Sequence, residues 1–284
     1  MCNREDMLWR NDLKRHVIVS FSMALLVASC TLSAVAPTPV IPLTGDTPQP
    51  ATPALPTPTG ASASALFFDG QDDYILIDDD PSLDLQNSFT IAAWIYLESY
   101  TEWASIVTKG DKPNINNYAL QQSGPDDPIY GTQFGTLRFS GCVGLSARLP
   151  ESQTVFSLRT WHFVAITFDG LNVTFYLNGQ QDGSFPVSGP LCTNDEPLYI
   201  GVDFPLTTEY WHGGIDELRI WNLALSETQI QDAMRRSVAP ADALVGYWNF
   251  DEGSGTIVHD RSGQENHGYL IGDPLWTSPG APIP

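Results

Sequence analysis

The chain has 284 residues and a formal net charge of -20, from 33 Asp and Glu against 13 Lys and Arg. Nucleic acid and anionic lipid both require basic patches, so this charge argues against either as a ligand. It is compatible with binding cations, and it is also typical of the solubilising surface of an exported protein.

Residues 1–29 have the features of an export signal. Basic residues precede the apolar run 17–27, which at about eleven residues suits the core of a signal peptide and is short for a membrane span. The run ends in Val27-Ala28-Ser29-Cys30, which resembles the lipobox of bacterial lipoproteins. The resemblance implies cleavage before Cys30 and a lipid anchor on that residue, and an ordinary secretory signal cut nearby is the alternative. Met7 is an alternative start of the chain.

The stretch from residue 30 to residue 62 is rich in proline, with eight prolines between Pro37 and Pro58. This composition favours extended polyproline conformations and cannot bury a core, so it predicts a semi-rigid stalk of up to about 3 Å per residue. The remaining residues, 63–284, are sufficient for one all-β domain of sandwich or barrel size.

The segment 161–179 gives the clearest structural signal. Two runs rich in β-branched and aromatic residues, Trp161–Phe168 and Leu171–Leu177, are separated by Asp169-Gly170, and Asn178-Gly179 closes the second run. Asp-Gly supplies the positive φ of a tight turn, so the segment predicts an antiparallel β-hairpin.

Further strands are predicted on both sides of this hairpin. They share β-branched or aromatic residues, partial alternation and flanking turn signals. With the hairpin they make at least nine strands, which suits two packed antiparallel sheets. These strands are Ala65–Phe68, Asp73–Ile77, Phe89–Leu97, Ala104–Lys109, Tyr118–Gln122, Thr136–Phe139, Leu198–Gly201 and Ile215–Trp221.

One short helix is predicted near the C-terminus. Ser226-Glu227-Thr228-Gln229 is a capping box, in which Ser226 accepts from the third backbone N–H while Gln229 reaches back. Ile230 and Met234 lie four residues apart and form its inner face.

Cys142 and Cys192 are the cysteines of the predicted domain. In an exported domain they predict a disulfide. On the chain-entropy model, a loop of this length contributes roughly 4 kcal/mol to stability.

Several motifs lie in order along the domain: Asp69-Gly70, Asp73-Tyr74, Trp161–Ala165, Tyr176–Gly179, Gly214–Asn222, Ala224–Ser226, Tyr247–Gly255 and Asp260–Gly263. They resemble the laminin G-like, concanavalin A-like jelly roll of lectins and glucanases. The resemblance covers nearly all of the chain after the stalk. It implies an all-β, two-sheet antiparallel jelly-roll sandwich with one short helix near the C-terminus.

The order of one motif differs from that family. In many members the Phe-Asp-Glu-Gly-Ser-Gly stretch opens the domain, whereas residues 250–255 follow the predicted helix. Residues 244–279 therefore either close this domain or are the stub of a second one. We favour the first interpretation because too few residues remain for another core.

The residues argue against an enzyme. Retaining glucanases of this fold carry two glutamates and an aspartate on one face of a strand, at the spacing that glycoside hydrolysis needs. The sequence has no Glu-x-Asp-x-x-Glu run, and Asp216 and Glu217 are adjacent. Adjacent side chains of a strand point to opposite faces, so this pair cannot cooperate.

The resemblance also implies a structural calcium ion, because related proteins hold one near the first strand and the strand that begins at Ile215. Asp69, Gly70 and Asp216 are the matching positions. Calcium accepts hard oxygen ligands in flexible geometry. The alternative is that Asp69-Gly70 is a turn and Asp216 an Asx-type cap.

A glycan site needs flat aromatic rings exposed on loops or on a concave sheet, with polar neighbours that fix the hydroxyls. Trp103, Tyr210 and Trp211 lie in polar, irregular stretches and are the candidates, with packing as the alternative role. Trp94, Trp161, Trp221 and Trp248 lie within strand patterns and are expected in the core.

Together these features predict a lipid-anchored recognition module on the cell surface that binds extracellular carbohydrate. A protein-binding adhesion module and a structural envelope domain without a ligand are the alternatives. We expect contact with the membrane through the lipid anchor only.

Overall fold

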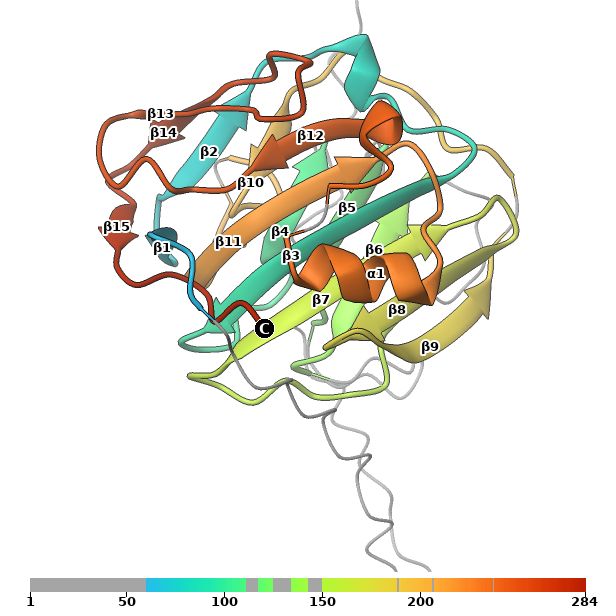
Figure 1. Cartoon of the computed structure of the whole chain (residues 1–284), viewed down its shortest axis with the longest axis horizontal. Coiled ribbons are helices and arrows are strands. Elements are labelled where there is room, and N and C mark those ends of the chain that lie inside the picture. Colours follow the sequence, from blue (N-terminus) through green and yellow to red (C-terminus); the bar gives the residue numbers. More distant parts are fainter. Residues whose placement is uncertain are drawn as a thin grey trace, which may run out of the picture. The chain divides into compact units, whose positions relative to one another are not determined.

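Strands dominate the part of the chain that the computed structural model describes, which comprises residues 60–110, 117–124, 134–142, 150–187, 189–205, 207–236 and 238–284. The predicted signal peptide, the lipidation at Cys30 and the stalk up to residue 59 lie outside the described residues. Two antiparallel sheets form a sandwich with a helix lying across it (Figure 1), which confirms the predicted fold class.

One sheet, called sheet A, has 8 strands in the order β15-β1-β11-β3-β7-β8-β9, with β12 paired to β11. Its strands are β1 (Ala65–Asp69), β3 (Phe89–Leu97), β7 (Trp161–Phe168), β8 (Asn172–Leu177), β9 (Gln180–Pro186), β11 (His212–Trp221), β12 (Leu244–Trp248) and β15 (Leu275–Thr277).

The other sheet, called sheet B, has 7 strands in the order β13-β14-β2-β10-β4-β5-β6. Its strands are β2 (Tyr74–Ile77), β4 (Ser105–Lys109), β5 (Tyr118–Gln122), β6 (Leu137–Gly141), β10 (Leu198–Ile200), β13 (Ile257–Val258) and β14 (Gly268–Ile271). The helices are the 3-10 turns η1 (Pro81–Leu83) and η2 (Ala241–Ala243) and the α-helix α1 (Glu227–Met234).

Alternation along the strands divides side chains between the core and the outer faces of the sandwich. In β3, Ile91, Ala93 and Ile95 enter the core between the sheets, whereas Ala92 and Trp94 point to the outer face of sheet A. A strand that is apolar on both faces needs a cover on its outer side, and β3 is such a strand.

Helix α1 provides part of that cover (Figure 1). Its predicted capping box is confirmed: the Ser226 side chain accepts from the Gln229 backbone, and the Gln229 side chain accepts from the Ser226 backbone. Ile230 and Met234 are buried in one cluster with Trp94, as the spacing predicted. In the described part of the chain, we find no helix with the length and apolarity to span a membrane.

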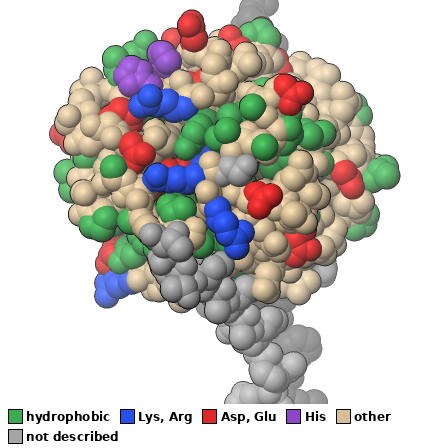
Figure 2. Space-filling view, in the orientation of Figure 1, with side chains coloured by type: hydrophobic (Ala, Val, Ile, Leu, Met, Phe, Trp, Pro, Cys, Tyr) green, Lys and Arg blue, Asp and Glu red, His purple; other side chains and the backbone are tan. Residues whose placement is uncertain are grey.

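The two ends of the described chain also lie over sheet A. We call residues 60–64 and 278–284 the terminal segments. Ser62 N donates to Ala281 O at 3.0 Å and Ile283 N donates to Gly60 O at 3.1 Å, so the segments pair with each other. Ala281 and Ile283 are buried in the cluster that contains Trp94. Figure 2 shows this side of the molecule, where Lys and Arg side chains are interspersed with Asp and Glu.

Residues 244–277 contribute strands to both sheets. Strand β12 pairs with β11, β14 pairs with β2, and β15 pairs with β1. This pairing supports the interpretation that the Phe-Asp-Glu-Gly-Ser-Gly stretch lies within the closing part of this sandwich.

The predicted disulfide between Cys142 and Cys192 is confirmed. Their Cα atoms lie 5.8 Å apart, which is the usual spacing. The bond ties the residue after β6 to the segment that precedes β10.

Candidate functional site

A row of aromatic side chains crosses the outer face of sheet A. Phe67 pairs with Gly214, Gly214 with Tyr96, and Tyr96 with Trp161, so the row spans β1, β11, β3 and β7. The ring centroids of Phe67 and Tyr96 are 6.3 Å apart, and those of Tyr96 and Trp161 are 5.7 Å apart. All three rings are partly exposed. We call Phe67, Tyr96 and Trp161 the aromatic row.

Gly214 allows these rings to gather. A Cβ atom at this position would lie 2.8 Å from the indole of Trp161 and 3.4 Å from Cβ of Tyr96. Real Cβ atoms do not approach another atom as closely as the first distance. The Trp161 ring therefore occupies the space that a side chain on β11 would fill.

A row of polar side chains lies beside the aromatic row, two residues away in sequence at each position. Two of its members lie in strands, β1 and β11, whereas the other two lie just after β3 and just before β7. Asp69 pairs with His212, and Glu98 N donates to His212 O at 3.0 Å. Glu98 forms an ion pair of 2.8 Å with Arg159. The ring centroids of His212 and Phe67 are 6.3 Å apart in an edge-to-face arrangement, so the two rows are adjacent. We call Asp69, His212, Glu98 and Arg159 the polar row.

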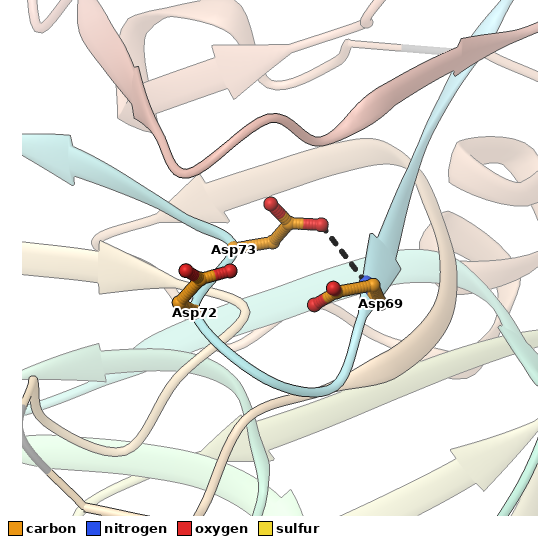
Figure 3. A group of neighbouring side chains, drawn as sticks. All are labelled: Asp69, Asp72 and Asp73. Carbon is orange, nitrogen blue, oxygen red and sulfur yellow. Dashed lines mark hydrogen bonds between the residues drawn. The ribbon is translucent and has the colours of Figure 1, made fainter.

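The polar row begins at an acidic turn between β1 and β2. Asp69, Asp72 and Asp73 each offer a carboxylate oxygen within 4.8 Å of the others (Figure 3). Asp69 and Asp72 are exposed, whereas Asp73 is buried and accepts from Asp69 N at 3.0 Å and Asp273 N at 2.7 Å. Burial raises the pKa of Asp73. Such a group of carboxylate oxygens is the donor set that calcium prefers.

Asp216 does not join this turn, so the predicted set of Asp69, Gly70 and Asp216 is not brought together. Asp69 pairs with His212, four residues from Asp216 along β11, which corresponds to about 13 Å at the rise of a strand. Asp216 is instead fully buried under the terminal segments, where Ser62 Oγ and Ala281 N donate to it. Burial raises the pKa of Asp216 to about 7.

The aromatic residues predicted for a glycan site lie elsewhere, and two of them are not exposed. Trp211 is 0% exposed within the core, and Tyr210 is 7% exposed. Tyr210 forms an isolated bridge with Val202, and Trp211 N donates to Gly201 O at 2.8 Å, so both lie on a returning segment directly before β11. The prediction of exposed rings is therefore wrong for these two positions.

Trp103 is partly exposed, but its ring is already in contact with other groups. The guanidinium of Arg138 lies 4.2 Å from the ring centroid. The ring also lies so close to Gly124 that an added Cβ there would collide with it at 1.8 Å. Trp103 thus lies against sheet B and is not part of the aromatic row.

A pair of carboxyl groups lies near Arg138 on the outer face of sheet B. Asp203 accepts from Ser105 Oγ at 3.1 Å and from Thr108 Oγ1 at 3.3 Å. Glu209 shares a hydrogen bond with Asp203, and burial together with that neighbour raises the pKa of Glu209 to about 7. The two catalytic carboxyls of a glycosidase stand about 5 Å or more apart, whereas these two are in direct contact.

The aromatic row was not predicted from the sequence as a candidate site, because its residues lie within apolar strand patterns. Phe67 and Tyr96 each stand between two core residues, so alternation places them on the outer face. That alternation was the available signal. Trp161 was expected in the core, but it is the first residue of β7 and is partly exposed.

A family model for the concanavalin A-like lectin/glucanases superfamily matches residues 69–231, more than half of the chain. A solved structure from Bacteroides ovatus, of a protein with a proposed carbohydrate-binding function, has a TM-score of 0.63 at 21% identity. That match covers 79% of this chain and 62% of the other, so this chain corresponds to less than two thirds of that protein. At this identity, the match supports the fold alone.

Two further solved structures are more distant. Domain 4 of AbnA, an extracellular arabinanase from Geobacillus stearothermophilus, in complex with arabinotriose, has a TM-score of 0.44 at 23% identity, covering 59% of this chain and 75% of the other. A pentraxin from Limulus polyphemus has a TM-score of 0.44 at 17% identity, covering 64% and 84%. No curated protein matches the chain.

Proposed function

Because the chain belongs to the concanavalin A-like lectin/glucanases superfamily, we propose that it is a lectin-like recognition module that binds carbohydrate at the aromatic row. The observation that carries this proposal is the set of three partly exposed rings in contact across four strands, with a polar row beside them. We propose recognition without catalysis.

The chemistry of the two rows suits a sugar. The C–H faces of a sugar ring pack on aromatic rings, and its hydroxyl groups need nearby donors and acceptors. Phe67, Tyr96 and Trp161 offer the rings. Asp69 and Glu98 offer acceptors, and Arg159 offers donors.

The test is a screen of the full chain on a broad glycan array, with calcium and with chelator. Tyr96→Ala and Trp161→Ala should each abolish binding to any glycan that the wild-type chain retains. Tyr269→Ala is the matched control, because Tyr269 is an aromatic residue of β14 that is 46% exposed and lies outside the row. Binding that survives both row variants, or no binding at all, would contradict the proposal.

We further propose that calcium binds the acidic turn through Asp69, with Asp72 and Asp73 in place of Asp216. An ion there would stabilise the turn from which the polar row begins. Calorimetric titration with calcium should show one site that Asp72→Asn weakens and that Asp216→Asn leaves unchanged. The reverse result would restore the set first predicted from the sequence.

The proposed setting is the cell surface. Cys30 carries the lipid, and the stalk follows it. The stalk ends before residue 60, because Gly60 and Ser62 pair with the C-terminal segment of the binding domain. Cys30→Ser should release the protein from membranes into the soluble fraction. Unchanged retention on membranes would contradict the lipid anchor without affecting the binding site.

A protein ligand is the second candidate, and a specific patch favours it. Ile257, Tyr269 and Ile271 are exposed near the edge of sheet B, and Ile257 pairs directly with Tyr269. Exposed apolar patches are common at protein-binding surfaces. If this candidate holds, Tyr269→Ala should reduce adhesion to protein-coated surfaces and Tyr96→Ala should not.

A further inference from the structure

The aromatic row is longer than one sugar residue. It crosses four strands, which corresponds to about 14 Å at the spacing of neighbouring strands. The rings follow each other at 6.3 and 5.7 Å, a spacing similar to the length of one sugar residue in a chain. A single terminal sugar would cover one ring and leave the other two in water.

The row also continues beyond Phe67. Leu275 of β15 pairs with Phe67 and is 65% exposed, so its side chain extends the apolar surface on the same face. Along one side, the row is bordered by the polar row. Along the other side, Asp216 and Trp94 lie under the terminal segments. A ligand therefore has room to extend across the strands.

The rings do not share a plane. Phe67 and Tyr96 are inclined by 54°, and Tyr96 and Trp161 by 56°. A flat crystalline surface cannot lie against two neighbouring rings that are inclined in this way. A single dissolved chain can turn from one sugar residue to the next and contact each ring in succession.

The charges beside the row disfavour an anionic chain. Glu98 lies next to the rings, and the guanidinium of Arg159 is already paired with Glu98 at 2.8 Å. The net charge of the whole chain is -20, which would repel uronate or sulfate groups at a distance.

On the basis of the proposed carbohydrate binding, we infer that the aromatic row binds an internal stretch of a neutral, linear, soluble glycan chain, oriented across β1, β11, β3 and β7. Each of three consecutive sugar residues contacts one ring. The polar row bonds the hydroxyl groups along one edge of the chain.

The test is a length series measured by calorimetry on the full chain. The probes are soluble gluco-, xylo- and manno-oligosaccharides of one to six residues, with crystalline cellulose and polygalacturonate as further probes. For the series that binds, affinity should rise by about tenfold with each further ring that is covered and level off near three or four residues. Crystalline cellulose and polygalacturonate should not compete.

Tyr96→Ala removes the central ring and should flatten this length dependence, whereas Tyr96→Phe should keep it. Two results would overturn this inference alone, provided that Tyr96→Ala still weakens binding. One is equal affinity for oligosaccharides of one and of six sugar residues, and the other is stronger binding of crystalline cellulose or polygalacturonate. The proposed function would be overturned as well by unchanged affinity in folded Tyr96→Ala and Trp161→Ala variants. Absence of binding to every probe would have the same consequence.

Discussion

Two tryptophans on the same outer face of sheet A have different surroundings. Trp94 pairs with Phe163, and two residues further along the same strands Tyr96 pairs with Trp161. Trp94 is 0% exposed and packs with α1 and the C-terminal segment, whereas Trp161 is partly exposed at the border of that cluster. A residue's position in the strand therefore sets the face that it occupies, and segments distant in the sequence determine whether that face is covered.

The covered part is expected to contribute stability and the uncovered row to contribute binding. Truncating Trp94 should therefore lower the free energy of unfolding more than any other substitution proposed below. Trp94→Ala removes a fully buried ring from a packed cluster, so we expect the free energy of unfolding to fall by about 3–5 kcal/mol. Urea denaturation measures this change. If the free energy of unfolding falls only as much as expected for an exposed residue, helix α1 and the terminal segments do not cover Trp94 in solution.

A second prediction concerns Asp216, which lies under the terminal segments. Its pKa is raised by burial to about 7, above its ordinary value of 3.8. The folded state therefore favours the neutral carboxyl. The contribution of the neutral Asp216 carboxyl to the free energy of unfolding is fully present below about pH 4. It is lost as the pH rises through about 7. Asn in this position keeps an oxygen for the donors Ser62 and Ala281 and does not ionise.

We therefore expect Asp216→Asn to be more stable than the wild-type chain above about pH 7, by up to roughly 4 kcal/mol, and to lose this advantage in acid. Denaturation at a series of pH values gives the difference. Asp203 and Glu209 titrate in both proteins, so their contributions cancel in that difference. Parallel pH profiles would show that the carboxyl of Asp216 is more accessible than the contacts of the terminal segments imply.

A third prediction tests the helix that forms part of the cover. Ser226→Ala removes the capping box of α1, which should lower the free energy of unfolding by about 1 kcal/mol. Ser254→Ala is the control, because Ser254 is exposed in the stretch before β13. Equal effects of the two substitutions would mean that the cap contributes little to holding α1 on the sheet.

Most of the secondary structure followed from local patterns in the sequence. The hairpin turn at Asp169-Gly170, the capping box at Ser226 and the long apolar strand Phe89–Leu97 each carry their own signal within a few residues. The disulfide was predictable because residues 1–29 predict export and because Cys142 and Cys192 are the two cysteines of the predicted domain.

The site was less predictable because it depends on pairing between distant strands. Phe67, Tyr96 and Trp161 meet only through the register of β1, β11, β3 and β7, and through the missing side chain of Gly214. The same register separates Asp216 from Asp69. Polar neighbours suggested that Trp211 was exposed, but its position directly before β11 carries it into the core.

The smallest expected effect on stability belongs to Trp161. Its ring is partly exposed, lies over Gly214 and only borders the covered cluster, so Trp161→Ala should change the free energy of unfolding by about 1 kcal/mol or less. The same substitution should abolish glycan binding if the aromatic row is the binding surface. Trp161→Phe should retain part of the binding because it keeps a ring. Measured together, a near-native unfolding curve and a lost glycan signal would separate the uncovered row from the covered cluster, whereas a large destabilisation would place Trp161 with Trp94 as a core residue.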